Sequence, residues 1–171
     1  MFLSARRIIL IITIAVIVMV IVLYPYILKI LAGKEITNLS ISLKNITLVT
    51  TNLTSSSVPL MVHFSIFNPT DKALTTSRIE YALYANGVNL GNNTLSYEDI
   101  PLNGRPQFYS GKNADLQSYF EINNLTESAK LFKEIIKNAN DTNRIKWEVR
   151  GEALIDSAFT SEPKSFTTTL N

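Results

Sequence analysis

The residue types that most often carry out catalysis are scarce in this chain. Its 171 residues include one histidine, His63, and no cysteine. Thiolate catalysis, disulfides and cysteine-ligated metals are therefore excluded, and one histidine cannot build a multi-histidine metal site. Because His63 lies in a mostly apolar stretch, it also lacks the polar partners of a catalytic triad. We expect His63 to have a structural role.

Acidic and glycine-rich motifs offer little more chemistry. Glu98 and Asp99 are adjacent, and adjacent residues of a strand point to opposite faces, so the two cannot share acid–base work. The sequence NANDTN (138–143) has oxygen ligands but lacks the acidic spacing of a calcium loop. The turns GVNLG and NGRP precede no helix that could hold phosphate. The sequence predicts no catalytic residue, no metal and no cofactor, hence no enzyme.

Residues 8–28 form an uncharged apolar segment that can cross a membrane. As a helix it rises about 31 Å, close to the roughly 30 Å of a bilayer's hydrocarbon core. Tyr24 and Tyr26 stand where interfacial aromatic anchors are expected. A signal peptide cut after Ala32 is the alternative, but the apolar run exceeds the usual length of about 7–15 residues and Ile30 is a poor −3 residue.

We therefore predict one retained anchor and one domain. Four of the 16 basic residues flank the apolar segment and all 14 acidic residues lie beyond it, which leaves the domain with twelve basic residues and a net charge of −2. A domain without a basic cluster lacks the footprint of a nucleic-acid binder. The predicted divisions are a tail (1–7), a transmembrane helix (8–28), a linker (29–36) and a single domain (37–171).

Sequons indicate which side of the membrane the domain occupies. The chain has six N-x-[ST] sequons, where roughly three are expected by chance. An Asn- and Thr-rich β protein also accumulates sequons by composition alone. We predict an extracytoplasmic domain on a single-pass cell-membrane anchor, with glycosylation candidates at Asn38, Asn45, Asn52, Asn92, Asn124 and Asn140.

Hydrophobic alternation predicts strands through most of the domain. Residues 38–54 alternate with one change of phase at Lys44-Asn45, which indicates a β-bulge. Residues 58–68 alternate until Pro69, which removes a backbone donor. Asn86-Gly87 predicts a type I′ hairpin turn between strands at 79–85 and 88–95. Further strands are expected within 114–125, 144–155 and 164–170.

One helix is expected inside the domain. It begins near Asn124, ends near Asn140, and has an apolar stripe that should pack on the sheets and seal the interior. About seven strands joined by turns and interrupted by one helix predict a mainly β fold, an antiparallel β-sandwich of immunoglobulin or fibronectin appearance, preceded by the transmembrane helix.

The order and spacing of these motifs resemble a known family. A hydrophobic strand ends at Asn68-Pro69, a second strand reads IEYALYANG up to Gly87, and KWEVRGEA near the end contains Gly151. This arrangement, over residues 37–170, resembles the water-stress and hypersensitive-response (WHy) domain of type 2 late-embryogenesis-abundant (LEA) proteins. Thr70 departs from the family's Asn-Pro-Asn box. The anchored, sequon-rich form is similar to archaeal members.

The resemblance implies a seven-stranded sandwich with one helix and no catalytic residues. It also implies desiccation and stress protection, and binding of lipid or another apolar ligand. The expected signature is an apolar groove between the sheets, lined by Phe64, Ile66, Phe132 and Ile136. A structural or adhesion subunit of the envelope, or of a surface filament, is the alternative function. The oligomeric state stays open.

Overall fold

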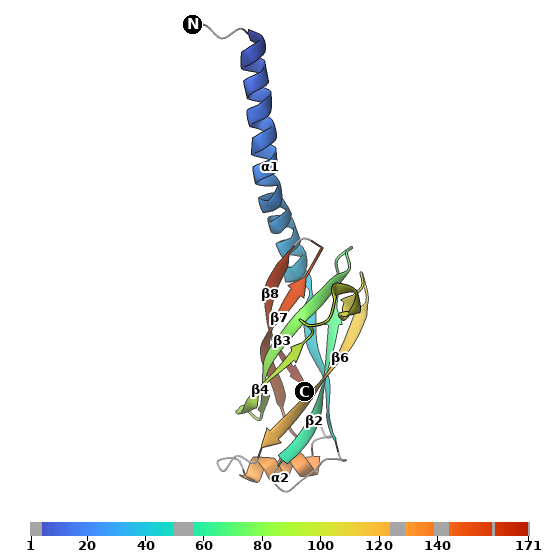
Figure 1. The fold of residues 1–171 in the computed structure, drawn as a ribbon. Coiled ribbons are helices and arrows are strands. Elements are labelled where there is room, and N and C mark those ends of the chain that lie inside the picture. The colour runs from blue at the N-terminus through green and yellow to red at the C-terminus, as the bar shows by residue number, and fades with distance from the viewer. Residues whose placement is uncertain (1–4, 50–56, 124–128, 139–143, 159, 171) are drawn as a thin grey trace.

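Two antiparallel β-sheets form a sandwich beneath one long N-terminal helix (Figure 1). The computed structural model describes residues 5–49, 57–123, 129–138, 144–158 and 160–170. The three-stranded sheet has the order β1 (Ser40–Leu48), β2 (Ser57–Phe67), β6 (Asn113–Asn123). The second sheet has the order β4 (Val88–Ser96), β3 (Leu74–Ala85), β7 (Trp147–Asp156), β8 (Ser161–Leu170), and β5 (Gln107–Phe108) pairs with β3. The predicted fold class is confirmed.

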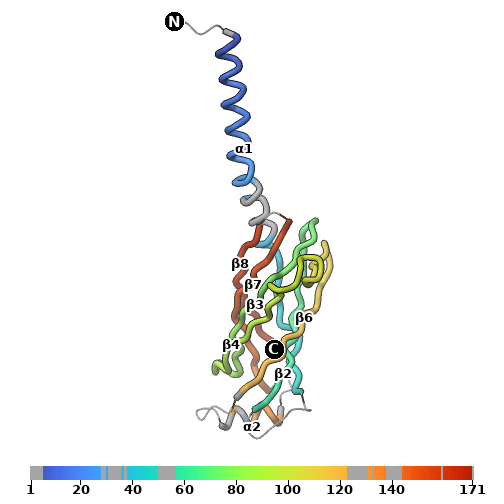
Figure 2. The backbone as a smooth tube through the Cα atoms, viewed as in Figure 1, coloured from blue at the N-terminus to red at the C-terminus, as the bar shows by residue number. Residues whose placement is uncertain are grey.

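Helix α1 (Ala5–Asn38) includes residues 29–36, where a linker was expected from the sequence. The helix extends from one end of the sandwich (Figure 2). Residues 29–36 read KILAGKEI, which contains no proline and only one glycine, so no local signal stops the helix. The end of α1 enters the sandwich, since Ile36 and Leu39 are buried in the core. The helix and the sandwich therefore meet without a flexible spacer.

Strand β2 provides the centre of the core. Its alternating residues point between the sheets, and five of them have no exposed surface: Val58, Leu60, Val62, Phe64 and Ile66. Between them, Pro59 is buried, and Met61, His63 and Ser65 are half-buried on the other side of the strand. The pairing of β1 with β2 shifts register between Leu43 and Asn45, where the bulge was predicted.

The hairpin between β3 and β4 turns at Asn86 and Gly87. Their φ angles are +50° and +83°, the two positive values that a type I′ turn requires. The Asn86 side chain also accepts a hydrogen bond from the Lys146 backbone at 2.9 Å, which ties the turn to the approach of β7.

Helix α2 (Ala129–Asn138) lies across the end of the sandwich opposite α1 (Figure 1). Its Ile135 is fully buried and joins the core, while Ile136 is partly buried against it. The helix therefore covers one end of the interior. The apolar stripe had predicted packing on a sheet face instead. Residues 124–128, where the helix was expected to begin, lie outside the described residues.

Candidate functional site

The Asn-Pro motif at the end of β2 builds a buried polar contact. The Asn68 side chain has no exposed surface, and its Nδ2 donates to the carbonyls of Lys72 and Phe108, both at 2.7 Å. Its Oδ1 accepts from the Thr70 backbone at 3.0 Å and from the Thr70 hydroxyl at 2.7 Å. One amide thus joins the ends of β2, β3 and β5, and we call it the Asn68 latch.

Thr70, the third residue of the Asn68-Pro69-Thr70 sequence, takes part in the latch. Thr70 uses both its N–H and its hydroxyl on the same Asn68 oxygen, so the turn is closed without another amide. The Asn68 backbone completes the contact, because its carbonyl accepts from the Gly111 N–H at 2.8 Å. These contacts satisfy the buried polar atoms locally, as buried polar groups require. The role that follows is structural.

Gly151 is required by close approach of its neighbours. A Cβ atom at this position would lie 2.3 Å from the Glu80 carbonyl and 2.9 Å from both the Phe166 ring and the Tyr81 Cβ. Gly87 differs, because a Cβ there would meet nothing within 4 Å and only its φ of +83° favours glycine. Gly87 and Gly151 are thus favoured as glycine for different physical reasons.

The residues predicted to line an apolar groove are placed in the core or near the far end. Phe64 and Ile66 are fully buried, and the Phe64 ring makes edge-to-face contacts with Tyr81 at 5.1 Å and Phe166 at 6.2 Å. Ile136 lies on α2. The Phe132 side chain is outside what the structure describes. Because β2 runs away from α2, Phe64 lies about 23 Å along the strand from Ser57.

A polar network closes the seam between β4 and β6. The Tyr81 hydroxyl donates to Ser118 Oγ at 2.6 Å, and Asn93 Nδ2 lies 2.6 Å from the Tyr119 carbonyl and 3.1 Å from Ser118 Oγ. Burial raises the pKa of the Tyr81 phenol above 10.0, and the hydrogen bonds to Ser118 and Asn93 oppose that shift. Side chains here join two strands that belong to different sheets.

A side-chain hydrogen bond also joins the two sheets at the opposite seam, between β1 and β8. The Leu43 backbone N–H donates to Thr168 Oγ1 at 2.9 Å, so a side chain of β8 satisfies an edge amide of β1. Edge strands with unpaired backbone groups are sites for adding a further strand. Both edges of the three-stranded sheet are therefore tied to the neighbouring sheet by side-chain hydrogen bonds.

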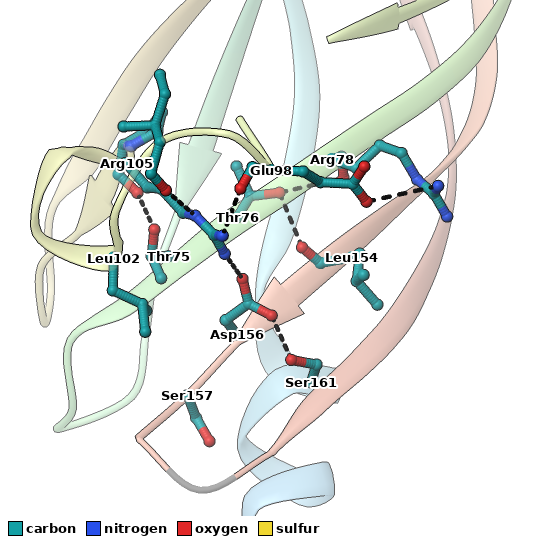
Figure 3. Close-up of polar contacts among 12 residues, drawn as sticks. Thr75, Thr76, Arg78, Glu98, Leu102, Arg105, Leu154, Asp156, Ser157 and Ser161 are labelled. Carbon is teal, nitrogen blue, oxygen red and sulfur yellow. Dashed lines mark hydrogen bonds and ion pairs between the residues drawn. The ribbon is translucent and has the colours of Figure 1, made fainter. Parts of the chain in front are cut away.

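An arginine clamp, which sequence analysis missed, fixes the connection between β4 and β5 (Figure 3). Arg105 donates to Asp156 at 2.9 Å and to the carbonyls of Ile100 at 2.9 Å and Glu98 at 3.2 Å. Asp156 also accepts from Ser161. Arg105 and Asp156 are mostly buried, and 51 positions separate them. No local pattern could have revealed the pair.

The residues considered for catalysis lie apart. His63 is on the outer side of β2, opposite Asn45 and Gln117 in the strand register. Glu98 is exposed and forms an ion pair with Arg78 at 3.6 Å, and Asp99 lies in the exposed turn that follows. Among the described residues, no group of three or more such side chains is placed to hold a metal ion.

Two surface hollows lie away from the predicted groove. One, of about 350 Å³, is on the outer face of the five-stranded sheet and is lined by charged and amide side chains that include Glu80, Arg150 and Glu152. The other, of about 330 Å³, lies beside the arginine clamp and includes Leu102, Thr75 and Asp156. Both linings combine apolar side chains with polar or charged ones.

Three of the six sequons lie within the described residues. Asn38 at the end of α1, Asn45 on β1 and Asn92 on β4 are all exposed. Asn45 accepts a hydrogen bond from the Ile46 backbone at 2.8 Å. Asn52, Asn124 and Asn140 fall outside the described residues, so their surroundings stay a prediction.

One helix among the described residues is long and apolar enough to cross a membrane. The segment Arg6–Ile27 of α1 has a mean hydropathy of 3.1, and none of it is buried against the sandwich. Moving a large aliphatic side chain out of water is worth about 1.5–3 kcal/mol. The segment is therefore unsuited to an aqueous surface, and it fits either a signal anchor or a signal peptide.

Comparisons with known proteins identify the fold. No known family model matches the sequence, and no curated protein matches it with significance. A solved Arabidopsis thaliana protein aligns with a TM-score of 0.50 at 14% identity, over 77% of this chain and 80% of its own. At this identity the likeness shows a shared β-sandwich fold and no more.

Two further structures are similar at lower scores. A candidate late embryogenesis abundant protein aligns with a TM-score of 0.42 at 11% identity, over 98% of this chain and 86% of its own. An Archaeoglobus fulgidus protein aligns with a TM-score of 0.43 at 14% identity, over 75% of this chain and 94% of its own.

Proposed function

We propose that this protein is a non-enzymatic, single-pass membrane protein whose LEA type 2-like sandwich faces the outside of the cell. The observation that carries the proposal is the fully exposed apolar segment Arg6–Ile27, which leads without a break into the sandwich. The latch at Asn68 and the packing at Gly151 give physical reasons for the motifs on which the family resemblance rests.

Retention of the anchor is part of the proposal. Proteolytic cuts concentrate at exposed loop tips, whereas Ala32, the candidate cleavage residue, lies inside α1. Full-length protein from its host membranes should resist extraction at alkaline pH, and its intact mass should include the N-terminal segment. A mature chain that begins at Gly33 would contradict the anchor.

The proposed role is protection against desiccation and related stress, with lipid or another apolar molecule as ligand. Phe64 and Ile66 are fully buried, so a ligand could reach them only if one of the two seams opened. Native mass spectrometry of the purified full-length protein should then detect a bound lipid that survives detergent exchange. Detection of the bare chain alone would remove the ligand from the proposal.

The side-chain bonds at both seams count against the alternative of a filament built by strand addition, because the edges of β1 and β6 are partly occupied. Light scattering of the full-length protein in micelles separates the two functions. A monomer supports the anchored binding module, and concentration-dependent chains of subunits would favour the structural subunit.

A further inference from the structure

The exposed apolar side chains of the sandwich gather at the end that carries α1. Six large apolar side chains are exposed within the described residues of the sandwich, and four lie at this end. They are Phe67, Ile100, Leu102 and Tyr109, with 39%, 39%, 61% and 59% of their surfaces exposed. We call these four residues the apolar rim.

Strand register places the rim beside α1. Phe67 pairs with Ser40, which begins β1 directly after the helix, and on its other side with Asn113, the first residue of β6. Tyr109 lies in the turn that leads to β6, and this turn is tied to the Asn68 carbonyl through the Gly111 N–H. Val88, another exposed apolar residue, follows the hairpin turn at the opposite end.

The loop that carries Leu102 is held rigidly although its side chain is exposed. The arginine clamp binds the carbonyls of Glu98 and Ile100, and Gln107 Nε2 donates to the Leu102 carbonyl at 2.9 Å. Leu102 points toward the end at which the pale blue helix α1 enters (Figure 3). A fixed loop that presents leucine outward indicates a surface that something apolar covers.

The length of α1 sets the distance between the rim and a membrane. From residue 28, the last of the apolar segment, to the buried Ile36 the helix rises about 12 Å. Each headgroup layer is about 5–7 Å thick, and spanning helices tilt by about 20° on average. Because Ile36 and Leu39 fix the helix to the core, a tilt of α1 toward the side of the rim brings the rim closer to the membrane surface.

We propose that the apolar rim rests in the headgroup layer of the bilayer that α1 spans. This inference rests on the proposed anchoring. Apolar and aromatic side chains on an anchored body add to membrane binding by entering the boundary between headgroups and acyl chains. The sandwich would then be held against the membrane at one end, with α2 and the turn at Asn86-Gly87 directed away from it (Figure 1).

Single-cysteine labelling tests the rim, because the chain has no native cysteine. Leu102→Cys and Tyr109→Cys, each with an environment-sensitive fluorophore, are reconstituted as full-length protein in phosphatidylcholine vesicles. Val88→Cys is the matched control at the far end, and Val18→Cys reports insertion of α1. Unchanged fluorescence of the sole tryptophan, the buried Trp147, confirms that each variant is folded.

Lipids with a spin label at the headgroup should quench the probes at 102 and 109 at least two-fold more than the probe at 88. Equal quenching at all three, with the probe at 18 quenched by deeply labelled lipid, would overturn the rim contact and leave the anchor intact. An unquenched probe at 18 would overturn both proposals. A blue shift at 102 without lipid quenching would mean that a second copy of this chain covers the probe, and it would also overturn the rim contact.

Discussion

At the scale of single residues, the Asn68 latch should be a main determinant of stability. Asn68→Ala removes the amide donor from the buried Phe108 carbonyl and the acceptor oxygen from Thr70. An unsatisfied buried polar group costs about 1–3 kcal/mol, so we expect a loss of about 1–3 kcal/mol in the free energy of unfolding. Urea unfolding of the full-length protein in micelles, followed by Trp147 fluorescence, measures the loss.

Asn92→Ala is the control for the latch, because Asn92 is an exposed asparagine on β4. Surface substitutions usually change stability by less than about 0.5 kcal/mol. Equal effects of the two substitutions would mean that the buried amide contributes little, and that Asn68 matters only for the geometry of the turn before Pro69.

Gly151→Ala should damage the fold far more than Gly87→Ala. At position 151 the new methyl meets the Glu80 carbonyl at 2.3 Å, so strands β3 and β7 must shift, which typically costs about 1–3 kcal/mol or more. At position 87 the methyl has room, and only the left-handed backbone opposes it, by about 1–2 kcal/mol. Thermal unfolding of both variants gives the ranking, and a less stable Gly87→Ala protein would refute it.

Tyr81 should make the fold sensitive to alkaline pH. Its folded pKa is raised above the ordinary 10.0 by burial. The stability from keeping the phenol neutral is therefore fully present below pH 10 and is lost as the pH rises through the folded pKa. Tyr81→Phe should lower stability at pH 7, because Ser118 and Asn93 lose a partner, and should flatten the decline above pH 10.

Comparing the two unfolding curves between pH 8 and 11.5 isolates the effect of Tyr81, because every other side chain is the same in both proteins. Burial also raises the pKa of Tyr97, so some alkaline decline should persist in the variant. Parallel curves for the two proteins would show that Tyr81 ionises as easily in the folded chain as in the unfolded one.

At the scale of elements, the end of α1 should behave as part of the sandwich. Ile36 is 2% exposed and belongs to the core, and truncating a buried isoleucine to alanine costs about 2–5 kcal/mol. Ile30 is 64% exposed on the same helix. We expect Ile36→Ala to lower the unfolding midpoint of the sandwich and Ile30→Ala to leave it unchanged. Equal midpoints would mean that α1 is only a tether.

The elements that the sequence predicted are those whose signals are local. Alternation along β2 and the Asn86-Gly87 turn depend on neighbouring residues, and both are confirmed. The first part of β3 was missed, because Thr75, Thr76 and Ser77 are buried polar residues that break the alternation. Their burial is possible because Thr75 and Thr76 donate to the carbonyls of Pro106 and Leu154. Strand β5 was also missed, because its two residues are too few to show alternation.

In the candidate site, too, the residues with local signals were predicted and their distant partners were missed. Asn68 and Gly151 stood out as motif residues, but their partners did not, because Phe108 lies 40 positions from Asn68. The Glu80 carbonyl and the Phe166 ring, which exclude a side chain at Gly151, also come from other strands. Contacts of this kind depend on how different strands pair and pack, which alternation within one strand does not specify.

At the scale of the whole molecule, the charge and the surface agree with a domain that stands on a membrane. The acidic residues all lie beyond the apolar segment, the rim lies beside α1, and the exposed sequons Asn45 and Asn92 lie on strands of the two different sheets. Asn38, at the end of α1, is a third exposed sequon, and glycans at these three positions would require a domain outside the cell. Sidedness is therefore the property that links the proposals.

Protein isolated from its host should have glycans at Asn38, Asn45 and Asn92 if the domain lies outside the cell, because all three side chains are exposed. Asn92→Gln should remove the mass of one glycan. Asn93→Gln is the matched control, since it keeps the sequon but disturbs the amide that bonds to Tyr119 and Ser118. It should lower stability without changing glycan mass. Bare asparagine at all six sequons by glycopeptide analysis would instead favour a domain on the cytoplasmic side.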